Sequence, residues 1–510
     1  MVDLVIGSGP AGVAVAAALL ARGRRVVMID GGKVLEPAGL ARQLSLASLN
    51  PTDLTADDRA AWAAPQHGSQ PGQVRRYGSD FAMEPEAATF ADAGGVALRS
   101  SRATGGLSNL WGAAVLPYRQ QDMAGWPITA DDLAPHYRAV ADLMPVTGRD
   151  DDLSPLFPAC LTPLHPALAP SPQGGALLHR LEERREALAK TGCHVGAARV
   201  AVNSACHQCG LCLHGCPWNH IFSARSVLAR FAGSALFDHR PGAVAHSFTE
   251  GADGVAVHLK GGGDVLGARL FIAAGVLETA RILLASQPGT SELTLLDSQQ
   301  AFLPMLHRWR SPAPPDQPPH TTLPQLFLEI DDRSVSPFTV HGQIYSWNDY
   351  YERDLMAGYG RKLPGTAPLW RMLSRRLMVA QLFLHSDHSA RIGLRLSGDG
   401  RLIACVTQGT GAARVMQAAM ARMAAAMGKG GMVALRIASR MGAAGASFHT
   451  GGTVPMATDP TAGHSDALGR PKGLSRVHLA DASTFPSIPA TTITFSAMAN
   501  AHRIGTLAPE

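Results

Sequence analysis

Four cysteines stand within eleven residues near the middle of the chain, in the order Cys-x2-Cys-x2-Cys-x3-Cys-Pro. They are Cys206, Cys209, Cys212 and Cys216. This spacing is typical of the thiolates that hold a bacterial ferredoxin-type iron–sulfur cluster. Zinc is the alternative, although its cysteine ligands usually come as two separated pairs. The spacing therefore favours a 4Fe–4S cluster with Cys216 as its fourth ligand. A remote ligand such as Cys193, or a 3Fe–4S cluster with three ligands, stays open.

The start of the chain carries a second chemical pattern. An apolar run at 2–6 is followed by a glycine-rich turn at 7–12, a stretch of helical character at 13–21, another apolar run at 26–29, and an acid. This order of strand, glycine turn, helix, strand and acid is what a dinucleotide site requires. The helix N-terminus would face the phosphates, and the acid would accept hydrogen bonds from ribose hydroxyls. The predicted contacts are Gly7, Gly9, Pro10, Ala11, Gly12 and Asp30.

Two later segments have residue patterns that suit further parts of such a dinucleotide site. Paired glycines followed by small polar residues suit a backbone pressed against a flat ligand, and these are Gly105, Gly106, Ser108 and Asn109. An ordinary loop is the alternative there. A second strand, glycine and helix joint contains Ala274 and Gly275 and is expected where a later segment completes a nucleotide-binding domain.

The remaining elements predict a second domain. Short strands are expected at 325–330, 338–345, 382–384 and 391–396, which we assign to an antiparallel sheet that binds substrate. Aromatic residues at 345, 347, 350 and 351 could stack on a sugar, although sheet core is the commoner role. Helices are expected at 129–143 and 177–190, and a methionine stripe at 416–427 is expected to be core. Residues 35–93 are predicted to form a long excursion, such as a lid.

Composition narrows the class of protein. The 510 residues carry a net charge of only +5, spread along the chain, which argues against nucleic-acid binding. No apolar run reaches the ~18 residues of a membrane span, and the start does not read as a signal peptide. We therefore expect a cytoplasmic protein, exported only if a partner carries the signal. The segment 370–379, with arginines among Leu and Met, could make peripheral contact with a membrane.

The C-terminal region resembles a known family. It contains the segments FHTGGTVPM at 448–456, SRVHLADASTFP at 475–486 and ITFSAMA at 493–499. These resemble the glucose–methanol–choline (GMC) oxidoreductases, in the branch with pyranose oxidase and the iron–sulfur FAD glucose dehydrogenases. The resemblance implies an α/β fold with a Rossmann-like FAD-binding domain and an antiparallel-sheet α+β substrate domain. It also implies that FAD is the dinucleotide and that Asp481, Ala482 and Thr492 contact it.

The resemblance also implies boundaries along the chain. The FAD-binding domain would comprise 1–125 as its first part, 196–286 as its second part together with the iron–sulfur loop, and 436–510 as its C-terminal part with the active-site histidine. A helical substrate or lid segment would fill 126–195, and the substrate-binding domain would fill 287–435.

The family's chemistry would fall on His449, which would accept the proton of a substrate hydroxyl as hydride leaves for the flavin. The family usually has a second His or Asn before Pro-x-x-Thr-Ile, and here Ile488 occupies that place. Isoleucine has no side-chain hydrogen bond to offer. Thr491 or another residue must take over, or the substrate must be held differently.

The leading hypothesis is an FAD-dependent dehydrogenase that oxidises a hydroxyl of a sugar-like or other alcohol. Its iron–sulfur cluster would pass electrons to an external acceptor, either a protein or a small subunit. One alternative is an oxidase or reductase of the same fold with a structural cluster. A non-catalytic electron-transfer protein is the other.

Overall fold

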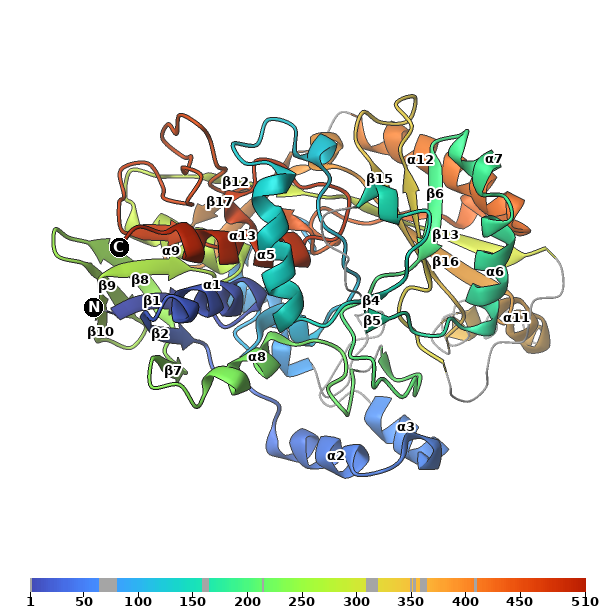
Figure 1. Cartoon of the computed structure of the whole chain (residues 1–510), viewed down its shortest axis with the longest axis horizontal. Coiled ribbons are helices and arrows are strands. Elements are labelled where there is room, and N and C mark those ends of the chain that lie inside the picture. The colour runs from blue at the N-terminus through green and yellow to red at the C-terminus, as the bar shows by residue number, and fades with distance from the viewer. Residues whose placement is uncertain are drawn as a thin grey trace.

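The computed structural model describes residues 2–63, 80–157, 165–212, 215–308, 320–348, 351, 355–357, 365–407 and 411–510. Five parallel strands form a sheet towards one end of the molecule (Figure 1). In spatial order they are β22 (Val477–Leu479), β11 (Arg269–Ile272), β1 (Val2–Ile6), β2 (Arg25–Asp30) and β7 (Phe237–Pro241). This arrangement confirms the predicted Rossmann-like fold.

The apolar runs of the sequence explain this sheet. The strands β1 and β11 are almost entirely buried, as expected for parallel strands covered on both faces. Helix α1 (Pro10–Ala21) packs on one face together with α13 (Thr494–Leu507), which brings the two ends of the chain side by side. The other face is covered partly by α9 (Val276–Ser286), which also packs on the strand β8 (Ala245–Glu250). β8 forms a small antiparallel sheet with β9 (Val255–Leu259) and β10 (Asp264–Gly267).

A larger antiparallel sheet occupies the other end of the molecule (Figure 1). Its strands in order are β19 (Met432–Ala434), β13 (Gln300–His307), β16 (Leu377–Phe383), β15 (Val340–Tyr345), β14 (Leu326–Ile330) and β6 (Cys193–Ala197), and β20 (Arg440–Met441) pairs with β13. One face packs against α12 (Ala412–Lys429), whose methionines at 416, 420, 423 and 427 are all buried. The predicted methionine core is therefore confirmed.

Alternation along β15 separates the two faces of this sheet. Val340 and Ile344 point into the core with α12, and a Cβ added at Gly342 would meet Met423 at 2.3 Å. The side chains of His341, Gln343 and Tyr345 must then point to the opposite face. That second face carries the polar residues from which the site is built.

One predicted strand belongs to a different sheet. The strand at 391–396 was expected in the substrate-binding sheet, but β17 (Arg391–Leu396) lies in a separate five-stranded sheet. It pairs with β12 (Leu293–Asp297) and β18 (Leu402–Thr407), and the outer strands of that sheet are β21 (Thr450–Gly451) and β3 (Phe90–Asp92). Its apolar face joins the core of β1 and β2. Alternation predicted the strand correctly, but the pairing of distant strands leaves no local signal.

Helices differ from the sequence-based expectation in three places. The helix expected at 177–190 is two helices, α6 (Pro172–Glu182) and α7 (Arg185–Ala189). The segment 370–379 is divided between α11 (Ala367–Ser374) and the start of β16. The excursion at 35–93 contains α2 (Pro37–Ala47) and α3 (Ala56–Ala63), which lie together below the rest of the molecule in Figure 1. No helix in the described residues is both long and apolar enough to cross a membrane.

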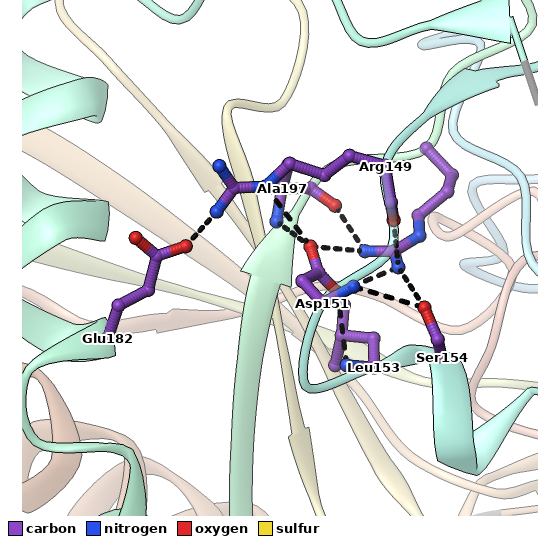
Figure 2. A network of polar contacts seen from close by, with 7 residues as sticks. Arg149, Asp151, Leu153, Ser154, Glu182 and Ala197 are labelled. Carbon is purple, nitrogen blue, oxygen red and sulfur yellow. Dashed lines mark hydrogen bonds and ion pairs between the residues drawn. The ribbon is translucent and has the colours of Figure 1, made fainter.

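Helix α5 (Ala130–Leu143) begins as predicted, because Thr129 and Asp132 form a reciprocal capping box. After it, a buried ion pair joins the loop at 149–154 to the end of β6 (Figure 2). The carboxylate of Asp151 accepts hydrogen bonds from Arg199 Nη2 at 2.7 Å and from the Ala197 N–H at 2.9 Å. Arg149 contacts both Asp151 and Glu182. These contacts hold the edge of the larger sheet against the middle of the chain.

Candidate active site

The carboxyl ends of four parallel strands meet at one cavity. Gly7 follows β1, Asp30 ends β2, Gly275 follows β11 and Asp481 follows β22, and all four line the same space. This is the edge at which open α/β sheets bind their ligands. The structure thus brings together three segments that are hundreds of residues apart in the sequence.

The glycines of the first turn differ in how closely they are packed. A Cβ at Gly7 would lie 2.4 Å from the Ala273 carbonyl oxygen, and one at Gly12 would lie 1.9 Å from the Gly7 carbonyl oxygen. Both positions therefore need glycine for close packing. A Cβ at Gly9 would meet nothing within 4 Å, because this residue borders the cavity together with Pro10 and Ala11. The open space lies where a pyrophosphate would meet the N-terminus of α1.

Asp30 presents an unused acceptor to the cavity. One of its carboxylate oxygens accepts a hydrogen bond from the Ser8 hydroxyl and lies 3.4 Å from His239 Nε2. The other, Oδ1, is buried and has no partner among the described residues. A ribose hydroxyl would satisfy it. The turn and this carboxylate therefore fit a dinucleotide such as FAD.

Asp481 joins the second strand and helix joint to the C-terminal segment. Its Oδ2 accepts hydrogen bonds from the Gly275 N–H at 3.0 Å and the Thr279 hydroxyl at 2.6 Å, and Oδ1 accepts one from the Ser483 N–H. Burial raises the pKa of Asp481, while these donors oppose the shift. Ala274 and Ala482 line the cavity beside it.

The segment at 105–109 contributes less surface than predicted. Gly106 lines the cavity, whereas Ser108 and Asn109 are engaged in the loop itself, with their side chains bonded to the carbonyls of Gly105 and Gly106 respectively. Gly105 has a φ of 88° and donates its N–H to Ser8. Of the C-terminal residues, Thr492 also lies behind the cavity wall, because its hydroxyl accepts the Leu116 N–H at 2.8 Å.

Arg102 and Phe448 are among the residues that line the cavity and were not predicted. The guanidinium of Arg102 lies at the cavity, with its Nη2 3.6 Å from Glu278 Oε1. Its Nε is buried and has no hydrogen-bond partner among the described residues. It stands in a stretch without any motif. Phe448 has a left-handed φ of 62°, which is strained for an aromatic residue and common at functional sites. Its place beside His449 in the family segment was the available signal.

His449 lies where the cavity meets the larger sheet. Its neighbours Phe448 and Thr450 line the cavity, while its ring stacks on Phe383 of β16 with the centroids 4.7 Å apart and the planes at 22°. The residue keeps some accessible surface, but its Nδ1 is buried without a partner among the described residues. Burial lowers the pKa of His449 to about 3, with a smaller contribution from His341. The imidazole is therefore neutral at pH 7, as a proton acceptor must be.

Ile488 is a packing residue in this fold. It is fully buried, and a Cβ at Gly451 would meet its Cδ1 at 2.7 Å. Its backbone exchanges two hydrogen bonds with Ser386, both at 2.9 Å. Thr491, the substitute considered from sequence, is buried with a hydroxyl that has no partner among the described residues. The side chain at position 488 therefore offers no polar group to a substrate.

The four predicted cluster cysteines share one partly buried loop. Burial, with smaller contributions from the neighbouring thiols, raises the pKa of Cys209 and of Cys212 to about 12. The sulfur of Cys216 accepts the His220 N–H at 3.2 Å, and that of Cys206 accepts the Gln208 N–H at 3.5 Å. Among the described residues, which omit 213–214 of this loop, no three Cys, His, Asp or Glu side chains form a group that could hold a metal ion. As they stand, the thiols are neighbours but do not converge as metal ligands.

The helices α2 and α3 cover this loop. Leu46, Leu54 and Trp62 pack against Cys209 in a small apolar cluster, and Arg59 donates to the Cys209 carbonyl. Gln43 of α2 bonds to the Pro217 carbonyl at 3.3 Å. The excursion predicted as a lid is thus, in its described part, a cover for the cysteines.

The fold and the site define a dinucleotide-binding oxidoreductase with a histidine between two domains. Comparison with known proteins identifies the class more closely. Residues 392–501 match the family GMC oxidoreductase. The structure is similar to the crystal structure of pyridoxine 4-oxidase from Mesorbium loti, with a TM-score of 0.59 and 15% sequence identity over 99% of this chain and 98% of that chain. No curated protein matches this chain in sequence.

Residues 392–501 are therefore similar to the GMC oxidoreductases, and the fold of the whole chain is similar to that of pyridoxine 4-oxidase. These similarities bear out the predicted family resemblance and fold class. They also support FAD as the cofactor of an oxidoreductase that acts on CH–OH groups. The cavity described above is the place where the residues of this chain would hold FAD.

Proposed function

We propose that this protein is an FAD-dependent dehydrogenase that oxidises a hydroxyl group of a neutral, sugar-like alcohol. The observation that supports this most directly is the position of His449 between the dinucleotide cavity and the polar face of the larger sheet. A substrate held on that face would place a hydroxyl beside the histidine. Bound FAD supplies the hydride acceptor.

The polar face of the sheet supports a polyhydroxylated substrate. Gln343 and Gln381 are cross-strand partners, and Gln381 in turn donates to Gln300 on the next strand. The hydroxyl of Tyr345 donates to Gln343 at 2.7 Å. Amides both donate and accept hydrogen bonds, so this row suits hydroxyl groups. Gln381 and Tyr345 keep accessible surface, and the predicted aromatic contact at Tyr350 lies outside the described residues.

Each residue then has a defined task. Asp30 and the glycine turn bind the dinucleotide, the glutamine row holds the substrate, and His449 accepts the hydroxyl proton as the substrate carbon loses its hydride. Anaerobic addition of neutral sugars and other alcohols should bleach the flavin absorbance of the purified protein. If none of them does so while dithionite does, the proposed reaction is wrong.

We further propose that the loop at 206–216 holds an iron–sulfur cluster that passes electrons to an external acceptor. The support is the ferredoxin-type spacing, the mutual proximity of the thiols and the N–H donors at two of their sulfurs. Visible and electron paramagnetic resonance spectra of the anaerobically purified protein should show iron together with flavin. Iron-free protein after reconstitution would contradict this proposal without affecting the first.

Cysteine replacement separates a relay from a structural cluster. In Cys209→Ser, a dye that takes electrons directly from flavin should still be reduced, while reduction of the natural acceptor should collapse. Cys405→Ser is the matched control, since Cys405 is an exposed thiol outside the loop. Equal loss of both activities in Cys209→Ser would indicate a structural role.

An oxidase is the second candidate, and the lack of a converged ligand group in the described residues favours it. In that case oxygen would reoxidise the flavin directly. Stoichiometric hydrogen peroxide formed from alcohol and oxygen, at the rate of turnover, would identify the oxidase.

A further inference from the structure

A buried acid and histidine pair lies on the polar face of the larger sheet. Glu329 of β14 and His341 of β15 are cross-strand partners, and neither side chain is exposed to solvent. His341 Nδ1 lies 2.6 Å from Glu329 Oε1. Burying a carboxylate is costly in free energy unless it is paired. Apolar side chains at these two positions would avoid that cost, so the pair calls for a functional explanation.

The neighbouring residues fix the proton on the ring of His341. The Tyr345 hydroxyl donates to Gln343 Oε1, which turns the amide nitrogen of Gln343 towards His341 Nε2 at 3.2 Å. An amide nitrogen can only donate, so Nε2 accepts and the proton of the neutral ring sits on Nδ1. His341 therefore donates to the Glu329 carboxylate, and its ring cannot rotate without breaking both bonds.

A ladder of rings connects this pair to the active site. The His341 ring lies 5.9 Å from that of Phe383, with an angle of 28° between the planes, and Phe383 stacks on His449 at 4.7 Å and 22°. Phe327 packs edge-on against His341 at 4.9 Å from the other side. Phe383 thus lies between a ring held by a carboxylate and the ring of the proton acceptor.

Other polar groups surround the pair and have tasks elsewhere. Asp122 is buried close enough to Glu329 for the two carboxylates to interact, and it accepts the Thr339 N–H at 2.9 Å. Arg119 bonds to Thr339 and pairs with Asp331 at 2.9 Å. His385 stacks on Phe338 and contacts the Asp122 carbonyl. Of the groups named here, His341 is the one whose ring stacks on Phe383.

We propose that Glu329 and His341 are positioning residues for His449, acting through Phe383. They orient the acceptor imidazole from the substrate domain, whereas the family pattern would place a second polar residue at the position of Ile488, in the C-terminal segment. In the reaction the substrate C–H hydrogen leaves with its electron pair for the flavin, the O–H proton passes to His449, and the C–O bond becomes a carbonyl. The ladder contributes the orientation of the imidazole, on which proton transfer depends steeply.

This inference rests on the proposed function, and anaerobic stopped-flow flavin reduction tests it. In Glu329→Gln and in Phe383→Leu the limiting rate of reduction should fall about 10- to 100-fold, while the dissociation constant of the alcohol changes less than about threefold, because neither side chain belongs to the glutamine row. Ile344→Val is the matched control. It changes β15, the strand between the two test positions that also carries His341, on the opposite face of the sheet, and it should leave the rate unchanged.

Coupling between the two sites distinguishes the ladder from two unrelated defects. The double variant should be about as slow as the slower single variant, since both changes break the same chain of contacts. Losses that multiply, or a folded Glu329→Gln with the wild-type rate, would overturn the proposal. If Glu329→Gln does not fold, His341→Gln decides by the same criteria.

A readout independent of turnover separates this inference from the proposed function. In holoenzyme labelled with 15N-histidine, the side-chain resonances of His449, assigned with His449→Asn, should shift in Glu329→Gln and Phe383→Leu but stay in place in Ile344→Val. Unmoved resonances would refute the positioning role. If no alcohol reduces the wild-type flavin, the proposed function fails while the resonances still decide this question.

Discussion

Asp297, at the end of β12, should make stability depend on pH. It is fully buried, and its carboxylate accepts hydrogen bonds from the Gly445 N–H at 2.8 Å and the Ser447 hydroxyl at 2.9 Å. It thus holds the loop that leads to His449. Burial raises its pKa from 3.8 to about 6, and the two donors reduce that shift.

The sign of the effect follows from proton binding. Between the two pKa values the folded protein keeps a proton on Asp297 that the unfolded chain has already released. The free energy of unfolding should therefore fall as the pH rises from about 3 to about 7, by about 3 kcal/mol in total, and this contribution should be constant above that window. The fall is the cost of burying the ionised carboxylate that organises the loop.

Asp297→Asn removes this titration and keeps the shape of the side chain. Denaturant unfolding of both proteins at several pH values from about 3 to about 7 measures the difference in free energy of unfolding between them. That difference should change by about 3 kcal/mol across the window. A difference that stays constant with pH would refute the reasoning, because it would mean that Asp297 ionises at the same pH in both states.

Three further predictions concern the cofactor, the proton acceptor and stability. Asp30→Ala should weaken FAD binding to the apoprotein by at least about tenfold, through lost ribose hydrogen bonds, while the exposed Asp238→Ala should not, as fluorescence titration can show. His449→Asn should slow flavin reduction by about 10²- to 10⁴-fold with full FAD content, and an unchanged rate would exclude it as the proton acceptor. Asp151→Asn should lower the free energy of unfolding by about 3–5 kcal/mol in denaturant titrations, since it leaves the charge of Arg199 buried, and a loss below about 1 kcal/mol would contradict this.

Local sequence patterns predicted the nucleotide-binding half well. The turn at 7–12 combines requirements that only a few residue types meet, because a side chain at Gly7 or Gly12 would overlap the backbone. The capping box at Thr129 and the buried methionines of α12 are likewise properties of one helix and its immediate neighbours. Such features need no knowledge of distant contacts.

Contacts between distant strands were not predictable in the same way. The membership of β17 in the sheet that joins the nucleotide-binding core depends on its pairing with β12 and β18, which alternation does not specify. The pair of Glu329 and His341 arises from the register of two strands, and nothing at either position marks it in the sequence. The engaged side chains of Ser108 and Thr492 also depend on partners far along the chain.

Ile488 shows that a family motif can lack one polar residue while other residues still hold the site in place. Its side chain packs against Gly451, and its backbone forms hydrogen bonds with Ser386. Ser386 follows shortly after β16, the strand that ends with Phe383. A polar side chain there would have to enter this packed space without a partner, which is costly. Because the sheet reaches His449 from the other side through Phe383, the orientation of the imidazole can be supplied by the substrate domain. The departure from the family pattern therefore bears on which domain positions the proton acceptor, and it does not by itself argue against alcohol oxidation.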